Sequence, residues 1–411
     1  MMRIAIVGAG IVGLTAAHAL LDRGHEVTLV DPGDNLQRPT DGNAGWIAHT
    51  DIMPLASPKA WRNLPRWMMD PLGPLTIRPS YLPTLAPWLL RFVLASSPAR
   101  IKASIAAIRD INAQALPAWQ SLLSSLHLDH LREKGILSVW RDRSHFQGAK
   151  DVIARQKEFG IAVEVLAPED LKAIEPALHN VQAAVLYPDA CHVSDPALLA
   201  ADLLRLALER GAVYVSAKAL GVEPNDDAVR IRTDGAAQDV MADRVLISAG
   251  VWSRKLAKQL GDSIPLDTER GYNATYAKGT FGLNRPIMFE GEGFVVSTLD
   301  TGDRVGGAVE FAGTQAPPNH ERTSAMITRL KRFLPHLDET QPATRWMGFR
   351  PSIPDSLPVI GKARRDARVV YAFGHGHYGL TQAAITSRLV AELMEARPAS
   401  LDLAPFSAQR F

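Results

Sequence analysis

Arg350 is the side chain in this sequence best suited to hold a small anion. It lies between Gly348 and Pro351, in the segment 348–361, whose prolines leave the backbone little freedom of motion. A guanidinium held in such a setting can bind a carboxylate through two parallel hydrogen bonds. The alternative is structural, because Arg350 could instead pair with the nearby Asp355.

A second candidate anchor lies in the segment 267–272, which is predicted to be a strand. The Tyr272 hydroxyl could share a bound carboxylate or order an amine. Arg270 lies two residues earlier, and in a strand these two side chains point to the same face. An ordinary half-buried strand tyrosine and a solvated arginine are the alternatives, and the sequence leaves them open.

Three histidines could transfer protons near neutral pH. His375 and His377 lie in the glycine-rich loop 374–379, and His49 follows the turn 43–45. His375 and His377 are candidates for general bases, and the alternative is that they fill space beside a bound cofactor. His49 could also face a bound cofactor. A base is not required if the substrate binds with a neutral amine, so the roles of the three stay open.

Length and composition bound the class of protein. A chain of 411 residues exceeds one ordinary core and predicts two domains, and a net charge of +2 gives no reason to expect nucleic acid. Cys191 is the only cysteine, which excludes an intramolecular disulfide and a cysteine-built metal site, and we predict no metal. The sequence suggests neither a signal peptide nor a spanning helix, so we expect a cytoplasmic protein.

The first thirty residues are typical of a nucleotide-binding βαβ unit. The β-branched run 3–7 predicts a buried parallel strand, 11–23 a helix, and 25–30 a second strand. A Gly-x-Gly-x-x-Gly motif joins the first strand to the helix. This context makes the motif far more specific than it would be alone.

Each residue of the motif has a physical task. Gly8 permits a tight turn, Gly10 lets the backbone approach a pyrophosphate, and Gly13 lets the helix pack on the strand. The helix N-terminus offers N–H groups to phosphates. Asp31 ends the second strand and can accept hydrogen bonds from ribose hydroxyls, which disfavours NADP and leaves FAD and NAD.

Three downstream segments decide between FAD and NAD. They are a strand ending in small residues (243–253), the proline-rich segment around Arg350 (348–361) and a glycine–histidine loop that leads into a helix (372–381). Together with the N-terminal motif, they make the chain resemble the D-amino-acid oxidase-like family of FAD enzymes. This family includes glycine and sarcosine oxidases and D-amino-acid dehydrogenases. Asn43-Ala44-Gly45, His192–Pro196 and Asp267–Tyr272 agree with it, and the last resembles the dehydrogenase branch.

The resemblance implies an α/β fold with a Rossmann-like FAD-binding domain and a second α+β domain with a mixed sheet for the substrate. The FAD-binding domain would comprise 1–50, 191–262 and 345–411, and the substrate domain 51–190 and 263–344. FAD would be bound without a covalent link, and a histidyl link through His49 is the alternative. The residues expected at the cofactor are Gly8, Ala9, Gly10, Ile11, Val12, Gly13, Asp31, Pro32, Asn43, Ala44, Gly45, Ala219, Ala249, Gly250, Trp252, Gly374, His375, Gly376, Gly379, Leu380 and Thr381.

The resemblance also implies a reaction. Arg350 would bind the α-carboxylate of a D-amino acid, or of a cyclic imino acid such as a proline derivative, and Cα would give a hydride to flavin N5. The imine would hydrolyse to a 2-oxo acid, and a quinone or an electron-transfer protein would take the electrons. The alternatives are a glycine- or sarcosine-type oxidase that uses oxygen, a non-catalytic FAD-binding subunit of a complex and an NAD-linked dehydrogenase.

The segment 54–102 differs in composition from the rest of the chain. Its tryptophans interleave with basic residues, and it contains a single acid; the residues concerned are Trp61, Trp67, Trp88, Lys59, Arg62, Arg66, Arg78, Arg91, Arg100, Lys102 and Asp70. Tryptophan with arginine is typical of a segment at a membrane surface. The alternative is a helical cap of the substrate domain with its tryptophans turned inward. Further along, 105–126 is helical in period and predicts one long helix.

Overall fold

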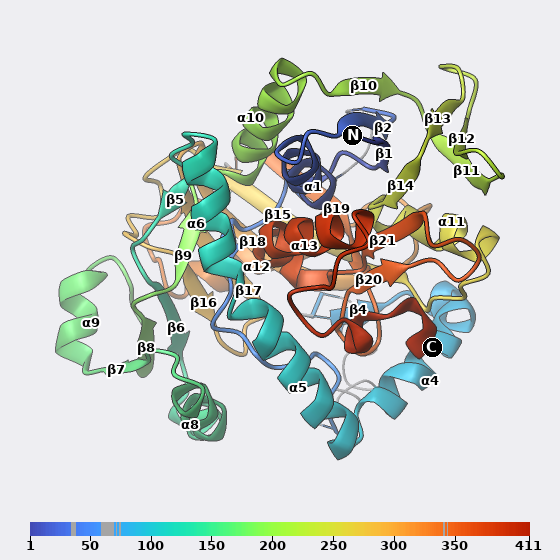
Figure 1. Ribbon diagram of the computed structural model, residues 1–411. Coiled ribbons are helices and arrows are strands. Elements are labelled where there is room, and N and C mark those ends of the chain that lie inside the picture. The colour runs from blue at the N-terminus through green and yellow to red at the C-terminus, as the bar shows by residue number, and fades with distance from the viewer. Residues whose placement is uncertain (34–37, 59–69, 71, 74, 340–341, 343) are drawn as a thin grey trace.

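The computed structural model of the protein describes residues 1–33, 38–58, 70, 72–73, 75–339, 342 and 344–411 (Figure 1). Strands fall into two large sheets and two small ones. One large sheet is mainly parallel, and the other is mixed. The predicted α/β class, with a Rossmann-like part and a mixed-sheet part, is therefore confirmed.

The mainly parallel sheet contains the predicted βαβ unit. Its strand order is β10-β2-β1-β14-β21-β20, in which only β20 runs antiparallel to its neighbour. The strands are β1 (Arg3–Val7), β2 (Glu26–Asp31), β10 (Val213–Ser216), β14 (Arg244–Ile247), β20 (Val359–Lys362) and β21 (Val369–Phe373). Because β1 and β2 are adjacent and parallel, Gly8 and Asp31 come together at the same edge of the sheet.

Helices cover one face of this sheet. The helices α1 (Ile11–Leu21) and α13 (Gly379–Met394) pack against each other through small and branched residues such as Ala16, Ala17 and Ala383. Both are buried almost all round, as expected of helices within a core. Figure 1 shows the first and last helices of the chain lying together, so the N-terminal and C-terminal segments are held side by side.

The second large sheet has the order β19-β15-β18-β17-β16-β6-β8-β7, with β4 paired to β18. Its strands are β19 (Thr344–Ser352), β15 (Asp267–Tyr276), β18 (Gly302–Phe311), β17 (Phe294–Leu299), β16 (Ile287–Phe289), β6 (Ile136–Trp140), β8 (Ala183–Tyr187), β7 (Glu164–Leu166) and β4 (Leu75–Ile77). The helix α12 (Glu321–Lys331) packs Met326, Ile327 and Leu330 onto phenylalanines of this sheet. This sheet carries Arg350 on β19 and Tyr272 on β15.

The two small sheets are three-stranded. One contains β11 (Ala219–Pro224), β12 (Val229–Thr233) and β13 (Val240–Ala242), and the other contains β3 (Trp46–Ile47), β9 (Cys191–Val193) and β5 (Leu131–Arg132).

Further α-helices of the described residues are α4 (Leu82–Ala95), α5 (Pro98–Asn112), α6 (Ala115–Ser125), α7 (Arg143–Gln147), α8 (Lys150–Glu158), α9 (Pro168–Ile174), α10 (Pro196–Glu209) and α11 (Ser253–Gln259). Within the described part of the chain, no helix has the length and apolar character needed to cross a bilayer.

The division of the chain into two domains remains a prediction, and one boundary needs revision. The prediction assigned 345–352 to the FAD-binding domain, whereas these residues form β19 and pair along their length with β15 of the mixed sheet. We therefore propose that the last FAD-binding segment begins after Ser352. The residue pattern did not reveal this because strand pairing between distant segments leaves no local trace.

The single helix predicted over 105–126 is wrong. The structure has two helices there, α5 and α6, with a break at Ala113 and Gln114. Pro117 explains the break, because its ring would clash with the carbonyl four residues earlier in a continuous helix. Proline is tolerated in the first turn of α6, where its missing N–H costs little.

The described part of the segment 54–102 packs inward at its tryptophan. Trp88 on α4 is 7% exposed, stacks on Phe92 with 5.3 Å between ring centroids, and also contacts Phe311. Arg78 forms an ion pair with Glu310. Trp61, Trp67, Lys59, Arg62 and Arg66 lie outside the described residues. Of the other basic residues named for this segment, Arg91, Arg100 and Lys102 are exposed.

Candidate active site

A cavity of about 1110 Å³ reaches both large sheets. On the side of the parallel sheet, it is lined by the ends of β1 and β2 and by the loop after β21. On the side of the mixed sheet, it is lined by parts of β15, β17, β18 and β19. Its size and its position beyond the carboxyl ends of parallel strands suit a dinucleotide with a substrate beside it.

At the N-terminal end, the glycine motif has the close packing that its type predicts. A Cβ at Gly8 would lie 2.6 Å from the Ser248 carbonyl oxygen, and one at Gly13 would lie 2.0 Å from the Gly8 carbonyl oxygen. At Gly10, a Cβ would meet nothing nearer than the Thr40 hydroxyl at 3.7 Å. Gly8 and Gly13 are therefore required by packing, and Gly10 leaves open space at the start of α1.

Asp31 is buried beside this turn. Its carboxylate accepts hydrogen bonds from the N–H groups of Ala9 and Gly33 at 2.8 and 2.9 Å. Arg38 pairs with it at 2.5 Å, and the Tyr214 hydroxyl donates to it at 3.3 Å. The carboxylate thus holds the turn of the motif and faces the cavity at the place expected for a ribose.

The loop 374–379 closes the other end. Gly374 has φ of +81°, and a Cβ there would lie 2.3 Å from Ile353. His375 is buried, its Nε2 lies 3.1 Å from the Thr386 hydroxyl, and burial lowers its pKa to about 3. Such a histidine stays neutral and fills space. The first turn of α13 presents N–H groups that no carbonyl of the helix can accept, which suits an electron-rich edge of a cofactor.

Most of the predicted cofactor residues line the cavity. Those that do are Gly8, Gly10, Ile11, Val12, Asp31, Pro32, Asn43, Ala44, Ala219, Ala249, Gly250, Trp252, Gly374, His375, Gly376, Gly379 and Leu380. The lining does not include Ala9, Gly13, Gly45 or Thr381. These four act within the wall, since Ala9 bonds Asp31, the Thr381 hydroxyl accepts the N–H of Ala48, and Gly13 and Gly45 pack against backbone.

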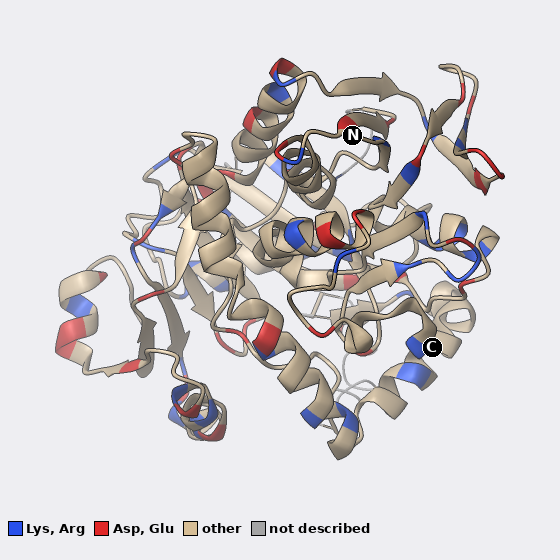
Figure 2. Ribbon diagram, in the orientation of Figure 1, with Lys and Arg blue, Asp and Glu red and all other residues tan. Residues whose placement is uncertain are grey.

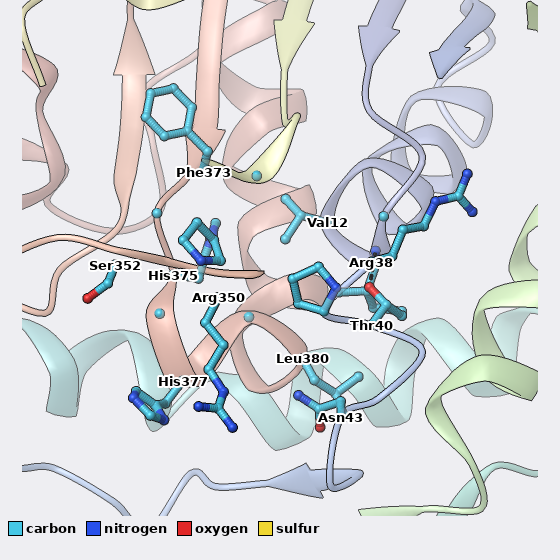
Figure 3. Close-up of a pocket in the computed structure, with 18 of the residues that line it drawn as sticks. Val12, Arg38, Thr40, Asn43, Arg350, Ser352, Phe373, His375, His377 and Leu380 are labelled. Atoms are coloured by element: carbon cyan, nitrogen blue, oxygen red, sulfur yellow. Dashed lines mark hydrogen bonds between the residues drawn. The ribbon is translucent and has the colours of Figure 1, made fainter. Parts of the chain in front are cut away.

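Arg350 reaches into the cavity with an incompletely bonded guanidinium. Its Nη1 atom is buried and has no hydrogen-bond partner among the described residues. The guanidinium lies over Gly271, where a Cβ would come within 2.4 Å of its Cζ. Burial lowers the pKa of Arg350, and Glu269 opposes this effect. Figure 3 shows Arg350 and His377 on one side of the pocket, with Arg38 and Thr40 on the other.

His377 also lines the cavity, and a buried carboxylate holds it. Its Nε2 lies 2.7 Å from Glu269, which is 2% exposed and also accepts the Ser352 hydroxyl at 2.5 Å. Burial would raise the pKa of Glu269, but His377, Ser352 and Arg350 outweigh it and hold the pKa below its ordinary value. The carboxylate is therefore ionised at neutral pH.

Arg270 does not line the cavity, so its predicted role as a second anchor is not supported. Its side chain is fully buried, and its guanidinium donates to the carbonyl oxygens of Ala312, Gly313, Ala316 and Pro317. In the pairing of β15 with β19, Arg270 stands opposite Phe349, whereas Glu269 stands opposite Arg350. Because strand side chains alternate, Arg270 and Arg350 lie on opposite faces of this strand pair.

Tyr272 lines the cavity, although its hydroxyl is already bonded. The hydroxyl donates to Glu310 at 2.5 Å and accepts the N–H of Asn319 at 3.1 Å. Glu310 also pairs with Arg78 at 2.7 Å and lies 3.7 Å from Arg270. The prediction that Tyr272 and Arg270 share a face is consistent with their contacts to one carboxylate.

His49 does not line the large cavity. It faces a smaller cavity of about 190 Å³, its Nδ1 lies 3.2 Å from the Ile47 carbonyl oxygen, and burial lowers its pKa. Ala48, Asp51 and Met53 line the large cavity instead. The chain after β3 thus forms a wall between the two cavities, with His49 on its far side.

Glu269 and Trp346 are among the residues of the site that were not predicted from the sequence. Arg270 and Tyr272 were predicted as site residues and Glu269 was not, although strand alternation places Glu269 on the face opposite to Arg270. Trp346 shares the face of Arg350 on β19, lines the cavity, and packs its ring where a Cβ at Gly42 or Gly348 would stand. A Trp-x-Gly-x-Arg spacing in a strand was the signal for it.

Comparisons with known proteins agree with this geometry. A family model described as FAD dependent oxidoreductase matches residues 3–393. A D-amino-acid oxidase of Bradyrhizobium diazoefficiens is 37% identical over 417 residues, covering 99% of this chain and 98% of the relative. A D-amino acid dehydrogenase of the same organism is 28% identical and covers 100% of this chain and 99% of that protein.

The fold has a counterpart among solved structures. The glycine oxidase of Geobacillus kaustophilus superposes with a TM-score of 0.76 at 21% identity, covering 100% of both chains. The predicted family resemblance, the class of enzyme and the cofactor FAD are confirmed. The chain belongs to the DAO family of FAD-dependent oxidoreductases.

Proposed function

We propose that this protein catalyses the oxidative deamination of D-amino acids with non-covalently bound FAD. The observation that carries the proposal is the buried, unpartnered Nη1 of Arg350 at a cavity that begins at a dinucleotide motif. A buried cationic group without a partner is costly, and a substrate carboxylate would complete its bonding. Two relatives named D-amino-acid oxidase and D-amino acid dehydrogenase supply the substrate class.

In this proposal, Arg350 binds the α-carboxylate and orients the amino acid. Bound FAD supplies the acceptor for the hydride that leaves Cα. The cofactor would rest on the glycine turn 8–13, on Asp31 and on the loop 374–379. The main contribution of the protein is position, since a substrate held by its carboxylate at one end has few ways to present Cα.

Anaerobic flavin bleaching tests the proposal. The purified yellow protein is mixed with D-amino acids, their L-enantiomers, D-proline derivatives, glycine and sarcosine, and the flavin absorbance is followed. We expect bleaching by at least one class of D-amino acid and a 2-oxo acid with ammonia as products. A protein that binds FAD but is bleached by none of these would be the non-catalytic subunit of a complex.

The electron acceptor is the finer part of the proposal. A quinone or an electron-transfer protein would serve a dehydrogenase, and oxygen would serve an oxidase of the kind that the 37% identical relative is named for. We assign the electrons to a quinone or a carrier because α4 carries exposed apolar residues with basic neighbours. Rapid formation of hydrogen peroxide under air, equal to substrate consumed, would overturn that assignment.

We propose a peripheral membrane contact through α4 and α5, which would give access to a quinone acceptor. Leu90, Val93 and Leu94 are 63%, 43% and 51% exposed, and basic residues accompany them without any acid between Arg78 and Arg109. Figure 2 shows Lys and Arg along the lower ends of these two helices. An apolar strip with basic neighbours suits an anionic bilayer. Sedimentation with vesicles containing phosphatidylglycerol, lost on Leu90→Ser with Leu94→Ser, tests this contact.

A further inference from the structure

Glu269 and His377 form a pair at the edge of the cavity that the binding of a carboxylate does not use. Glu269 comes from β15 and is held by two donors, His377 and Ser352. Its carboxylate can only accept, so the Nε2 of His377 must carry the proton between them. In the neutral imidazole, the lone pair then lies on Nδ1.

The Nδ1 of His377 is the atom that remains open to a ligand. The side chain is 36% exposed and lines the cavity, and Nδ1 has no hydrogen-bond partner in the part of the chain that the structure describes. Glu269 thus fixes both the tautomer and the orientation of the ring. This is how a carboxylate prepares an imidazole as a base in other enzymes.

Charged groups from three elements surround His377. Glu269 from β15 and Asp51 from the chain after β3 attract an imidazolium, and Arg350 from β19 lies near Glu269 and opposes it. Ser352 donates to Glu269 and keeps it ionised. The pair can therefore carry one extra proton without leaving an isolated buried charge.

We infer that His377, positioned by Glu269, accepts the proton that the amino group of the substrate must lose before oxidation. An amino acid at neutral pH carries an ammonium, whose nitrogen has no lone pair to assist departure of the hydride from Cα. One N–H bond breaks, its electron pair stays on nitrogen, and the proton joins Nδ1 of His377. The exposed edge of the ring later returns this proton to water. The inference rests on the proposed function.

The pH dependence of kcat/KM is the first test. The base must be neutral to accept the proton, so we expect kcat/KM of the wild type to rise with pH. Glu269→Gln removes the charge that favours imidazolium, and we expect this limb to move by about one pH unit or more to lower pH. His377→Asn abolishes the limb, lowers kcat/KM about 10²-fold at pH 7, and lets it recover as the substrate amine deprotonates in solution.

Ligand binding gives a readout that does not depend on turnover. 2-Aminoisobutyrate has no Cα–H, and isobutyrate also lacks the amine; both are titrated against the flavin absorbance of the holoenzyme. Between pH 8 and pH 6, we expect the Kd of 2-aminoisobutyrate to rise about tenfold, because imidazolium and ammonium repel. The Kd of isobutyrate should not rise, and His377→Asn should make both constants independent of pH.

A matched control is His145→Asn, a histidine exposed on α7 and outside the cavity lining, which should behave as wild type. If His377→Asn and Glu269→Gln both oxidise amino acids with the wild-type pH profile, the inference fails while the proposed function stands. If no amino acid reduces the flavin of the wild type, the proposed function itself has failed. A variant that does not fold is replaced by His377→Gln, for which the same two outcomes apply.

Discussion

Two arginines on neighbouring strands, one fully buried and one half-buried with a buried Nη1, show how differently one side-chain type can be used. Arg270 on β15 and Arg350 on β19 belong to the same strand pair and lie on its opposite faces. Arg270 is surrounded by carbonyl oxygens that take up its donors. Arg350 keeps a buried nitrogen without a partner at the wall of a cavity.

The difference teaches that burial alone does not identify a functional arginine. A guanidinium whose donors are all accepted by the protein is part of the fold, since a ligand could add nothing to it. A guanidinium with an N–H group that no protein atom accepts can bind an anion, because folding has already removed that group from water. The two positions should therefore respond to substitution in opposite ways.

Replacing Arg350 should give the largest effect. Arg350→Ala removes two charge-assisted hydrogen bonds to the carboxylate, worth about 1.5–3 kcal/mol each. We expect kcat/KM to fall about 10²- to 10⁴-fold, mainly through KM. Stability should be unchanged or slightly higher, since an incompletely bonded charge is removed. Steady-state kinetics and urea unfolding measure the two quantities.

Arg345→Ala is the matched control for Arg350. Arg345 lies on the same strand, is exposed, and does not line the cavity, so KM should stay within about twofold of the wild type. A KM of Arg350→Ala that stays near the wild-type value would remove the carboxylate assignment.

Replacing Arg270 should mainly change stability. Arg270→Met keeps much of the volume but leaves several carbonyl oxygens without their donor, and Glu310 loses one of its two neighbouring arginines. We expect the free energy of unfolding to fall by about 3–5 kcal/mol. For the fraction that folds, KM should stay close to the wild type. Chemical denaturation followed by intrinsic fluorescence measures the loss.

Arg230→Met is the control for Arg270. Arg230 on β12 makes an exposed ion pair with Asp239, and its loss should cost about 1 kcal/mol or less. If Arg270→Met were as stable as Arg230→Met and instead raised KM, the contrast between the two faces would be mistaken.

The contrast also marks what could be predicted from the sequence. The βαβ unit needed only local signals, because the strand, the glycine turn and Asp31 lie within one short stretch. Arg350 was found because its proline-rich setting is local too. The expected role of Arg270 as an anchor is not supported, because backbone carbonyl oxygens of 312–317 accept its donors, and a strand pattern does not show such distant partners.

Glu269 shows the limit more sharply. Its partner His377 lies 108 positions away, and only the fold brings the loop after β21 against β15. The same holds for His49. Its side chain faces the smaller cavity, which is formed with residues distant in the sequence, so the local pattern could not show its direction. The break between α5 and α6, by contrast, was readable from Pro117 and was overlooked because the helical period continues across it.

Tyr272 combines features of Arg350 and Arg270, because it lines the cavity and its hydroxyl is bonded within the protein. The main effect expected of Tyr272→Phe is smaller than that of Arg350→Ala or Arg270→Met. The ring lines the cavity, but the hydroxyl is bonded to Glu310 and to the N–H of Asn319. Its removal leaves both partners short of a bond, so we expect a loss of about 1–3 kcal/mol in the free energy of unfolding. KM should change less than about threefold, because less than 1 kcal/mol of substrate binding is at stake. An increase of tenfold or more at unchanged stability would mean that the hydroxyl leaves Glu310 and contacts the substrate.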